Sequence, residues 1–217
     1  MGLITADHAE WAVVDRMRQM IEVPQGDYLA TQTYALFTSV LCWVLQHLRI
    51  PEPQRLTAKD KAAHELLTQL QGCDARHAPW SVPTAPVERI ERTGSSSIRV
   101  PATHGFEGQT IEQVLINLRN AVAHGDARNV KPFNSGPTLV GFTFDCSDRM
   151  GWIGQMTLLR SDMRRVGTEL ATRYRDAILR SGKEMYGPHF PAEGETMGEW
   201  ASEDVVSTAR SGQQVPN

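Results

Sequence analysis

The stretch from Thr110 to Gly125, TIEQVLINLRNAVAHG, decides how this chain is expected to fold around its most reactive side chains. Its apolar residues recur every three or four positions, which is the period of one face of an α-helix. Thr110 and Gln113 have the spacing of a capping box, and Gly125 is a residue type that commonly ends a helix. The apolar stripe consists of Ile111, Val114, Leu115, Leu118 and Val122.

A polar cluster lies near the end of this helix. Arg119, Asn120 and His124 supply a guanidinium, an amide and an imidazole within about two helical turns. At about 100° per residue, Asn120 points away from the apolar stripe, and His124 lies beside it. Gln113 and Asn117 are expected on the same outward face, while Arg119 flanks the core. Because such groups bind a phosphate and move a proton, they are the candidate catalytic residues.

Arg119-Asn120 followed by His124, near the end of a helix in an otherwise helical chain, resembles the signature of the HEPN-domain family. The resemblance implies a helical bundle that forms a homodimer through the motif helix, with two copies of the motif in one cleft. It also implies a metal-independent endoribonuclease that needs no cofactor and acts on RNA in a toxin–antitoxin or antiviral defence setting. A protein antitoxin is then an expected partner. By this resemblance Arg119 and His124 are catalytic, and Asn120 orients them.

Other interpretations stay open. A non-catalytic HEPN module would use the same polar ridge for dimerisation or for binding nucleotide or RNA, and would act with a partner protein. A helical adaptor would instead recruit other proteins through its long loop and its tail. The plainest alternative for the motif is a solvent-facing helix end, where His124 only complements the helix dipole.

Composition agrees with one globular domain. The 217 residues are 41% hydrophobic and 22% charged, which is enough apolar content for a real core. A net charge of −3 argues against a general nucleic-acid coat, although it allows an enzyme that binds one phosphate in a locally basic cleft. The sparse cysteines form no metal-ligand pair or disulfide framework and fit a reducing cytoplasm, and no other metal site is indicated. They are Cys42, Cys73 and Cys146.

The periodicity along the chain predicts a mainly α-helical domain over residues 1–183, built from about five helices, and a flexible acidic tail over 184–217. The segment 28–49 is apolar nearly all round and is expected to be central in the bundle. Its apolar run is well short of the roughly 20 residues that span a bilayer, so no membrane contact is expected. The other expected helices, besides the motif helix, are 6–23, 57–72 and 159–181.

Two segments break the helical pattern. Residues 73–106 hold four prolines and a Gly-Ser-rich run, which predicts a long loop with a short strand at 98–100. Variable surface is the simpler interpretation of this loop, and a lid over the polar cleft is the alternative. Residues 138–158 alternate between apolar and polar around a turn, which predicts a β-hairpin inserted before the last helix.

Cations outside the motif are candidates for RNA contacts. Arg128, Lys131 and Arg149 lie in connecting segments near the motif and are candidate phosphate ligands, although scattered surface cations explain them equally well. The outer face of the last helix is also basic. It is expected to be a solvated face, with a track for an RNA backbone as the alternative; its residues are Arg164, Arg165, Arg173, Arg175 and Arg180.

Overall fold

The computed structural model describes residues 9–48, 57–83, 90–91, 97–98, 106, 108–123, 129–148 and 151–186 of the chain. Among these residues the fold is mainly helical, with a three-stranded antiparallel sheet directly before the last helix. The coarse sequence prediction is therefore confirmed. Among the same residues, no helix combines the length and the apolar composition needed to cross a membrane.

The five predicted helices are all present, and their bounds are close to the expected ones. They are α1 (Ala9–Glu22), α2 (Leu29–His47), α3 (Ala58–Gly72), α4 (Ile111–Ala123) and α5 (Arg160–Tyr186).

Helix α5 is longer than predicted. It continues to Tyr186, beyond the expected helix end at 181 and beyond the expected domain end at 183. The physical reason is local, because Lys183, Glu184 and Met185 are good helix formers and no proline occurs before Pro188. The predicted tail from residue 187 onward lies outside the described residues.

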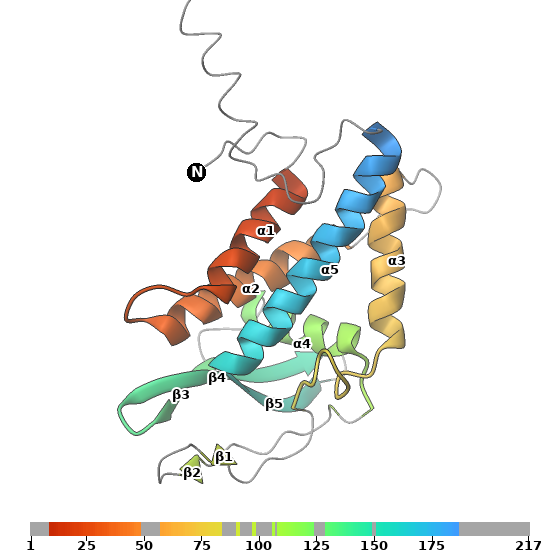
Figure 1. The fold of residues 1–217 in the computed structure, drawn as a ribbon. Coiled ribbons are helices and arrows are strands. Elements are labelled where there is room, and N and C mark those ends of the chain that lie inside the picture. Colours follow the sequence, from red (N-terminus) through yellow and green to blue (C-terminus); the bar gives the residue numbers. More distant parts are fainter. Residues whose placement is uncertain are drawn as a thin grey trace, which may run out of the picture.

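Helix α5 runs through the middle of the bundle and packs against α1, α2 and α3 (Figure 1). Gly167 lets the helices approach closely, since a Cβ there would lie 3.2 Å from the Phe37 ring and 3.3 Å from the Ile21 side chain. The face of α5 that points into the core is apolar and fully buried, as a central helix requires. It consists of Met163, Val166, Leu170, Ala171 and Tyr174.

Helix α2 is less enclosed than its composition predicts. It buries Phe37, Val40 and Leu41 against its neighbours, but one face remains exposed. Small or polar residues occupy that face, so the apolar content of α2 is concentrated on the other side. The exposed residues are Thr31, Ala35, Ser39 and Gln46.

The predicted hairpin is part of a larger sheet. Strands β3 (Val130–Ser135), β4 (Thr138–Asp148) and β5 (Gly151–Leu159) are antiparallel in the order β3-β4-β5. Strands β4 and β5 correspond to the predicted hairpin, whereas β3 was not predicted. Pro132 argues against a strand because proline cannot donate a ladder hydrogen bond, yet β3 is an edge strand, where proline is tolerated.

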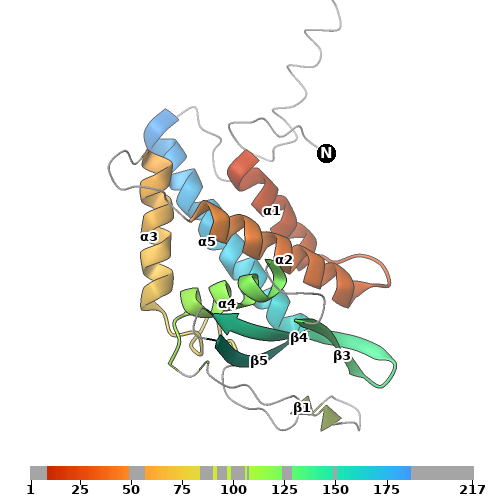
Figure 2. The same cartoon turned by 180° about the vertical axis from the view of Figure 1, so that it is seen from behind.

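One face of the sheet joins the helical core. Helix α4 lies between the sheet and α2 (Figure 2). Phe144, Met156 and Leu158 are fully buried on this side of the sheet. Tyr34 on α2 stacks on Phe142 of β4, with ring centroids 4.1 Å apart. These aromatic contacts make Tyr34 a packing residue between α2 and the sheet.

The predicted loop over 73–106 is partly a packed element. In its first section Ala75, Trp80 and Val82 are buried, and Arg165 on α5 donates hydrogen bonds to the carbonyls of Trp80 and Ser81, at 3.1 and 2.9 Å. The interpretation as plain variable surface is therefore wrong for this section. Farther along, strands β1 (Ile90–Glu91) and β2 (Ser97–Ile98) form a small pair, with β2 overlapping the expected strand. The remainder of 84–107, apart from residue 106, lies outside the described residues.

Candidate functional site

The helix that carries the motif begins as predicted. The amide of Gln113 donates to the Thr110 hydroxyl at 3.3 Å, and the amide of Thr110 donates to Gln113 Oε1 at 3.0 Å. This reciprocal pair is the expected capping box. The amide of Ile111 also donates to the carbonyl of Cys73 at 2.9 Å, which ties the start of α4 to the segment that follows α3.

The buried face of α4 contains four of the five predicted stripe residues, all but Val122, and is wider than periodicity predicts. Asn117 was expected on the outward face, but only 7% of it is exposed, and its Nδ2 donates to Gln109 Oε1 at 3.0 Å. Ala121 is also buried, whereas Val122 is only partly buried. The reason is that α4 contacts α2, α3 and the sheet together, so its covered surface is wider than one apolar stripe. Asn117 is a buried, hydrogen-bonded core residue.

The first two motif residues lie in the last two turns of α4. Arg119 and Asn120 are both half-buried, and the helix ends at Ala123. His124 and Gly125, which follow directly, lie outside the described residues. The structure therefore places the guanidinium and the amide on adjacent positions at the end of a well-packed helix, and the position of the imidazole stays a prediction.

The charge of Arg119 acts on a residue outside the motif, on a different helix. Burial raises the pKa of the Cys42 thiol on α2, and the positive charge of Arg119 opposes that rise. The motif end of α4 is thus near enough to the middle of α2 for the charge of Arg119 to act there. No sequence signal links two residues on different helices in this way, because helical periodicity describes each helix alone.

The candidate phosphate ligands outside the motif are only partly described. Lys131 is exposed on the edge strand β3, opposite Thr143 of β4. Arg128 and Arg149 lie outside the described residues. The three cations therefore remain candidates, and only Lys131 has a known place in the fold.

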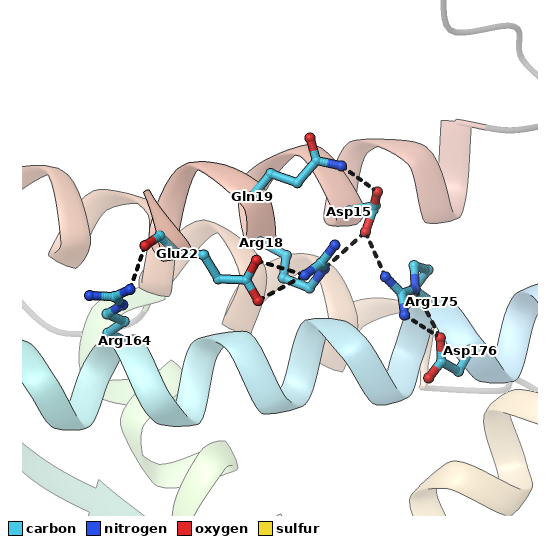
Figure 3. Close-up of polar contacts among 7 residues, drawn as sticks. All are labelled: Asp15, Arg18, Gln19, Glu22, Arg164, Arg175 and Asp176. Atoms are coloured by element: carbon cyan, nitrogen blue, oxygen red, sulfur yellow. Dashed lines mark hydrogen bonds and ion pairs between the residues drawn. The ribbon is translucent and has the colours of Figure 1, made fainter. Parts of the chain in front are cut away.

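Most of the arginines on α5 hold the fold together. Arg164 donates to the backbone carbonyl of Glu22 at the end of α1, and Arg175 donates to Asp15 on α1 at 3.1 Å (Figure 3). Arg173 pairs with Glu169 and lies over the ring of Trp80. With Arg165 bound to backbone carbonyls, a freely solvated face or an RNA track over all these residues does not fit. The guanidinium groups of Arg164, Arg165, Arg173 and Arg175 make contacts within the protein, whereas Arg180 is exposed.

No group of three or more His, Cys, Asp or Glu side chains gathers into a metal-binding arrangement within the described part of the chain. Comparison with known proteins finds no matching family model, no matching curated protein and no matching solved structure. Any functional conclusion therefore depends on the chemistry of the residues themselves.

Proposed function

We propose that this chain is a metal-independent endoribonuclease of the HEPN type. The observation that carries the proposal is the position of Arg119 and Asn120 in the last turns of α4, half-exposed, with His124 following directly after the last helical residue. A mainly helical fold around this helix is the architecture that the resemblance implies. The chemistry follows from the three side chains.

The reaction would be a transesterification at one phosphate of RNA. The 2′-oxygen attacks the adjacent phosphorus, a P–O bond to the 2′-oxygen forms, and the bond to the 5′-oxygen of the next nucleotide breaks. The 2′-hydroxyl gives up its proton and the departing 5′-oxygen takes one up, and His124 is the candidate for this proton transfer because an imidazole suits neutral pH. Arg119 would stabilise the charge that develops on the phosphoryl oxygens, and Asn120 would orient the imidazole or the phosphate. The products are a 2′,3′-cyclic phosphate and a 5′-hydroxyl.

The proposal includes a homodimer. Pairing two protomers through α4 would bring two arginines, two asparagines and two histidines into one cleft, and a composite cleft of this kind concentrates positive charge locally. This is how a chain of net charge −3 would bind a polyanion. The expected setting is cytoplasmic, with a protein antitoxin or another partner that controls the activity.

The decisive experiment compares wild type with His124→Ala and Arg119→Ala on defined RNAs in EDTA, followed by analysis of the product ends. Arg180→Ala is the matched control, since Arg180 is exposed near the far end of α5. We expect cleavage by wild type and by the control, cyclic phosphate ends, and a loss of at least about 100-fold in both motif variants.

Three outcomes would count against this assignment. Equal cleavage by all four proteins would mean that other residues, or a contaminant, are responsible. Cleavage that EDTA abolishes would contradict a metal-independent reaction. Intact RNA with every protein, including with candidate activators added, together with specific RNA binding would favour the non-catalytic module.

A further inference from the structure

Two neighbouring hollows meet at the first residues of α5. The larger, of about 620 Å³, lies between the start of α2, the β3–β4 turn and the start of α5. The smaller, of about 580 Å³, follows the first turns of α5. Arg160 and Ser161 line both hollows, so the two are neighbours on this surface, and together they are named the α5 depression. Neither Arg119 nor Asn120, the two motif residues that the structure describes, lines it.

The aromatic side chain at the α5 depression, that of Tyr28, is exposed to solvent over most of its surface. Tyr28 lies at the N-cap of α2, lines the larger hollow and is 82% exposed. Its ring therefore has little part in the core. An exposed aromatic ring beside a hollow offers a face on which a nucleic-acid base stacks, whatever the base.

One of the cations at the α5 depression makes no contact that stabilises the described part of the fold. Arg160 is exposed, and within the described residues it makes no hydrogen bond or ion pair. Arg164 lies one turn farther along the same face of α5 and gives one nitrogen to the Glu22 carbonyl. Arg165 is committed to the segment around Trp80 and to Asp162. Arg160 is therefore the cation best placed to bind a phosphate.

The acidic groups around the α5 depression leave it positive. Glu22 is paired with Arg18, and Glu169 is paired with Arg173. Asp27 is the carboxylate of the larger hollow, and it faces the same space as Arg160. Among the described residues Arg160 and Arg164 have no carboxylate partner, and one unpaired carboxylate opposes them, so an anion is favoured over a cation as the ligand.

Neutral polar groups add possible partners for phosphate oxygens. The hydroxyl of Ser161 lines both hollows. Thr168 lines the smaller hollow, and its buried Oγ1 has no hydrogen-bond partner in the described structure. Buried hydroxyls are normally bonded, so an unsatisfied one at the wall of a hollow is a feature that a polar ligand or water would explain.

We infer that the α5 depression binds single-stranded RNA, with a phosphate at Arg160 and Ser161 and a base stacked on Tyr28. This inference rests on the proposed function, because it supplies a second place at which an RNA substrate is held. Helix α2 connects the two places: Tyr28 begins it, and Cys42, beside Arg119, lies 14 residues farther on, or about 21 Å at ~1.5 Å per residue. A short single strand spans that separation.

The test is RNA binding measured apart from cleavage. All variants are made in the His124→Ala background, and fluorescence anisotropy follows a labelled 12-nucleotide oligouridine in EDTA over a range of salt concentrations. Arg160→Ala should weaken binding about fivefold or more and lower the salt slope by about 0.7, because one phosphate contact is lost from a single strand. Tyr28→Ala should weaken binding without changing the slope, because stacking involves no counterion release.

The matched control and a reverse variant sharpen the test. Arg180→Ala removes an exposed arginine from the same helix, 20 residues or about 30 Å from Arg160, and should leave the affinity within twofold. Asp27→Asn should tighten binding, since it removes the opposing carboxylate. Circular dichroism and thermal melting check that each variant is folded, with Arg160→Gln as the replacement if Arg160→Ala is not.

Several results would overturn the inference. Unchanged affinity in both Arg160→Ala and Tyr28→Ala would do so, and so would an equal loss in Arg180→Ala, which would indicate diffuse charge attraction. Competition by an acidic peptide as effective as by unlabelled RNA would point to a protein ligand instead. Because cleavage is not measured, an inactive wild type would overturn the proposed function and still leave these binding differences to be seen.

Discussion

The guanidinium of Arg119 on α4 acts on the thiol of Cys42 on α2. Burial raises the pKa of Cys42, and the charge of Arg119 keeps that rise smaller than it would otherwise be. This relationship joins the motif to the neighbouring helix and gives the site a chemical reporter that works without any substrate.

Replacing Arg119 should change the reactivity of Cys42. In Arg119→Ala the pKa of the thiol rises further, so the thiolate fraction at pH 8 falls, and iodoacetamide should alkylate Cys42 more slowly than in wild type. Peptide mass spectrometry over a time course measures the rate. Arg119→Lys should restore it, and Cys73 provides the control thiol in the same sample. An unchanged rate at Cys42 would show that the two groups do not interact.

The pairing of α1 with α5 should depend on Asp15. Its carboxylate accepts hydrogen bonds from Arg18 at 2.9 Å and from Arg175 at 3.1 Å (Figure 3). Asp15→Asn keeps the shape but removes the charge, and should cost about 1–2 kcal/mol of unfolding free energy. Urea denaturation measures this. Asp27→Asn, at an exposed position, is the control and should shift stability by less than about 0.5 kcal/mol. Equal stability of the two variants would argue that the network is only a surface feature.

Trp80 should be the anchor of the segment after α3. It is 1% exposed, and the guanidinium carbon of Arg173 lies 5.4 Å from the centre of its ring. Trp80→Ala leaves a large cavity and should cost about 3–5 kcal/mol. Trp80→Phe should cost clearly less, because the ring is kept. Denaturation followed by circular dichroism compares both with Val23→Ala at an exposed position. A loss below about 1 kcal/mol in Trp80→Ala would mean that this segment does not contribute to the core.

Two glycines should respond oppositely to alanine. At Gly141 on β4, a Cβ would lie 2.3 Å from the carbonyl oxygen of Leu158 on the neighbouring strand. Gly141→Ala should therefore cost about 2–3 kcal/mol, since two backbones have to separate. Gly72 ends α3, with no atom within 4 Å of the added Cβ, and Gly72→Ala should gain about 0.5 kcal/mol. Thermal melting separates the two cases, and stabilisation by Gly141→Ala would contradict the strand packing.

Stability should fall in alkali because of Cys146. Burial, and then the neighbouring Asp145 carboxylate, raise the pKa of this thiol from 9.0 to about 12. Above pH 9 the unfolded chain releases this proton while the folded protein retains it, so the folded state loses up to ~1.4 kcal/mol per pH unit until about pH 12.

The comparison of melting temperatures at pH 8 and pH 10 tests this. The decrease should be smaller in Cys146→Ala than in wild type. Cys73→Ala is the control and should behave as wild type does, because Cys73 is only half-buried. An equal decrease in all three proteins would mean that Cys146 does not set the alkaline limit.

The limits of prediction can be seen in particular residues. Asn117 has the helical angle of an outward residue, yet it is buried, because three neighbouring elements surround α4 and not one. Strand β3 was not predicted, and Pro132 argues against a strand there. Proline is acceptable in β3 only because that strand lies at the edge of the sheet. Arg164 and Arg175 read as solvent-facing on α5, but α1 supplies partners for both.

The sequence by itself determined which segments form helices and where the motif helix begins, because apolar period and the Thr110–Gln113 capping pair act within a few residues of each other. It also determined that Arg119 and Asn120 are adjacent near a helix end. Only the tertiary structure decided that Arg119 lies near Cys42 and that Tyr28 and Arg160 share a depression. It also decided that most arginines of α5 bind groups within the protein. The physical reason is that helical period fixes directions about one axis, whereas packing between distant segments decides which side chains meet.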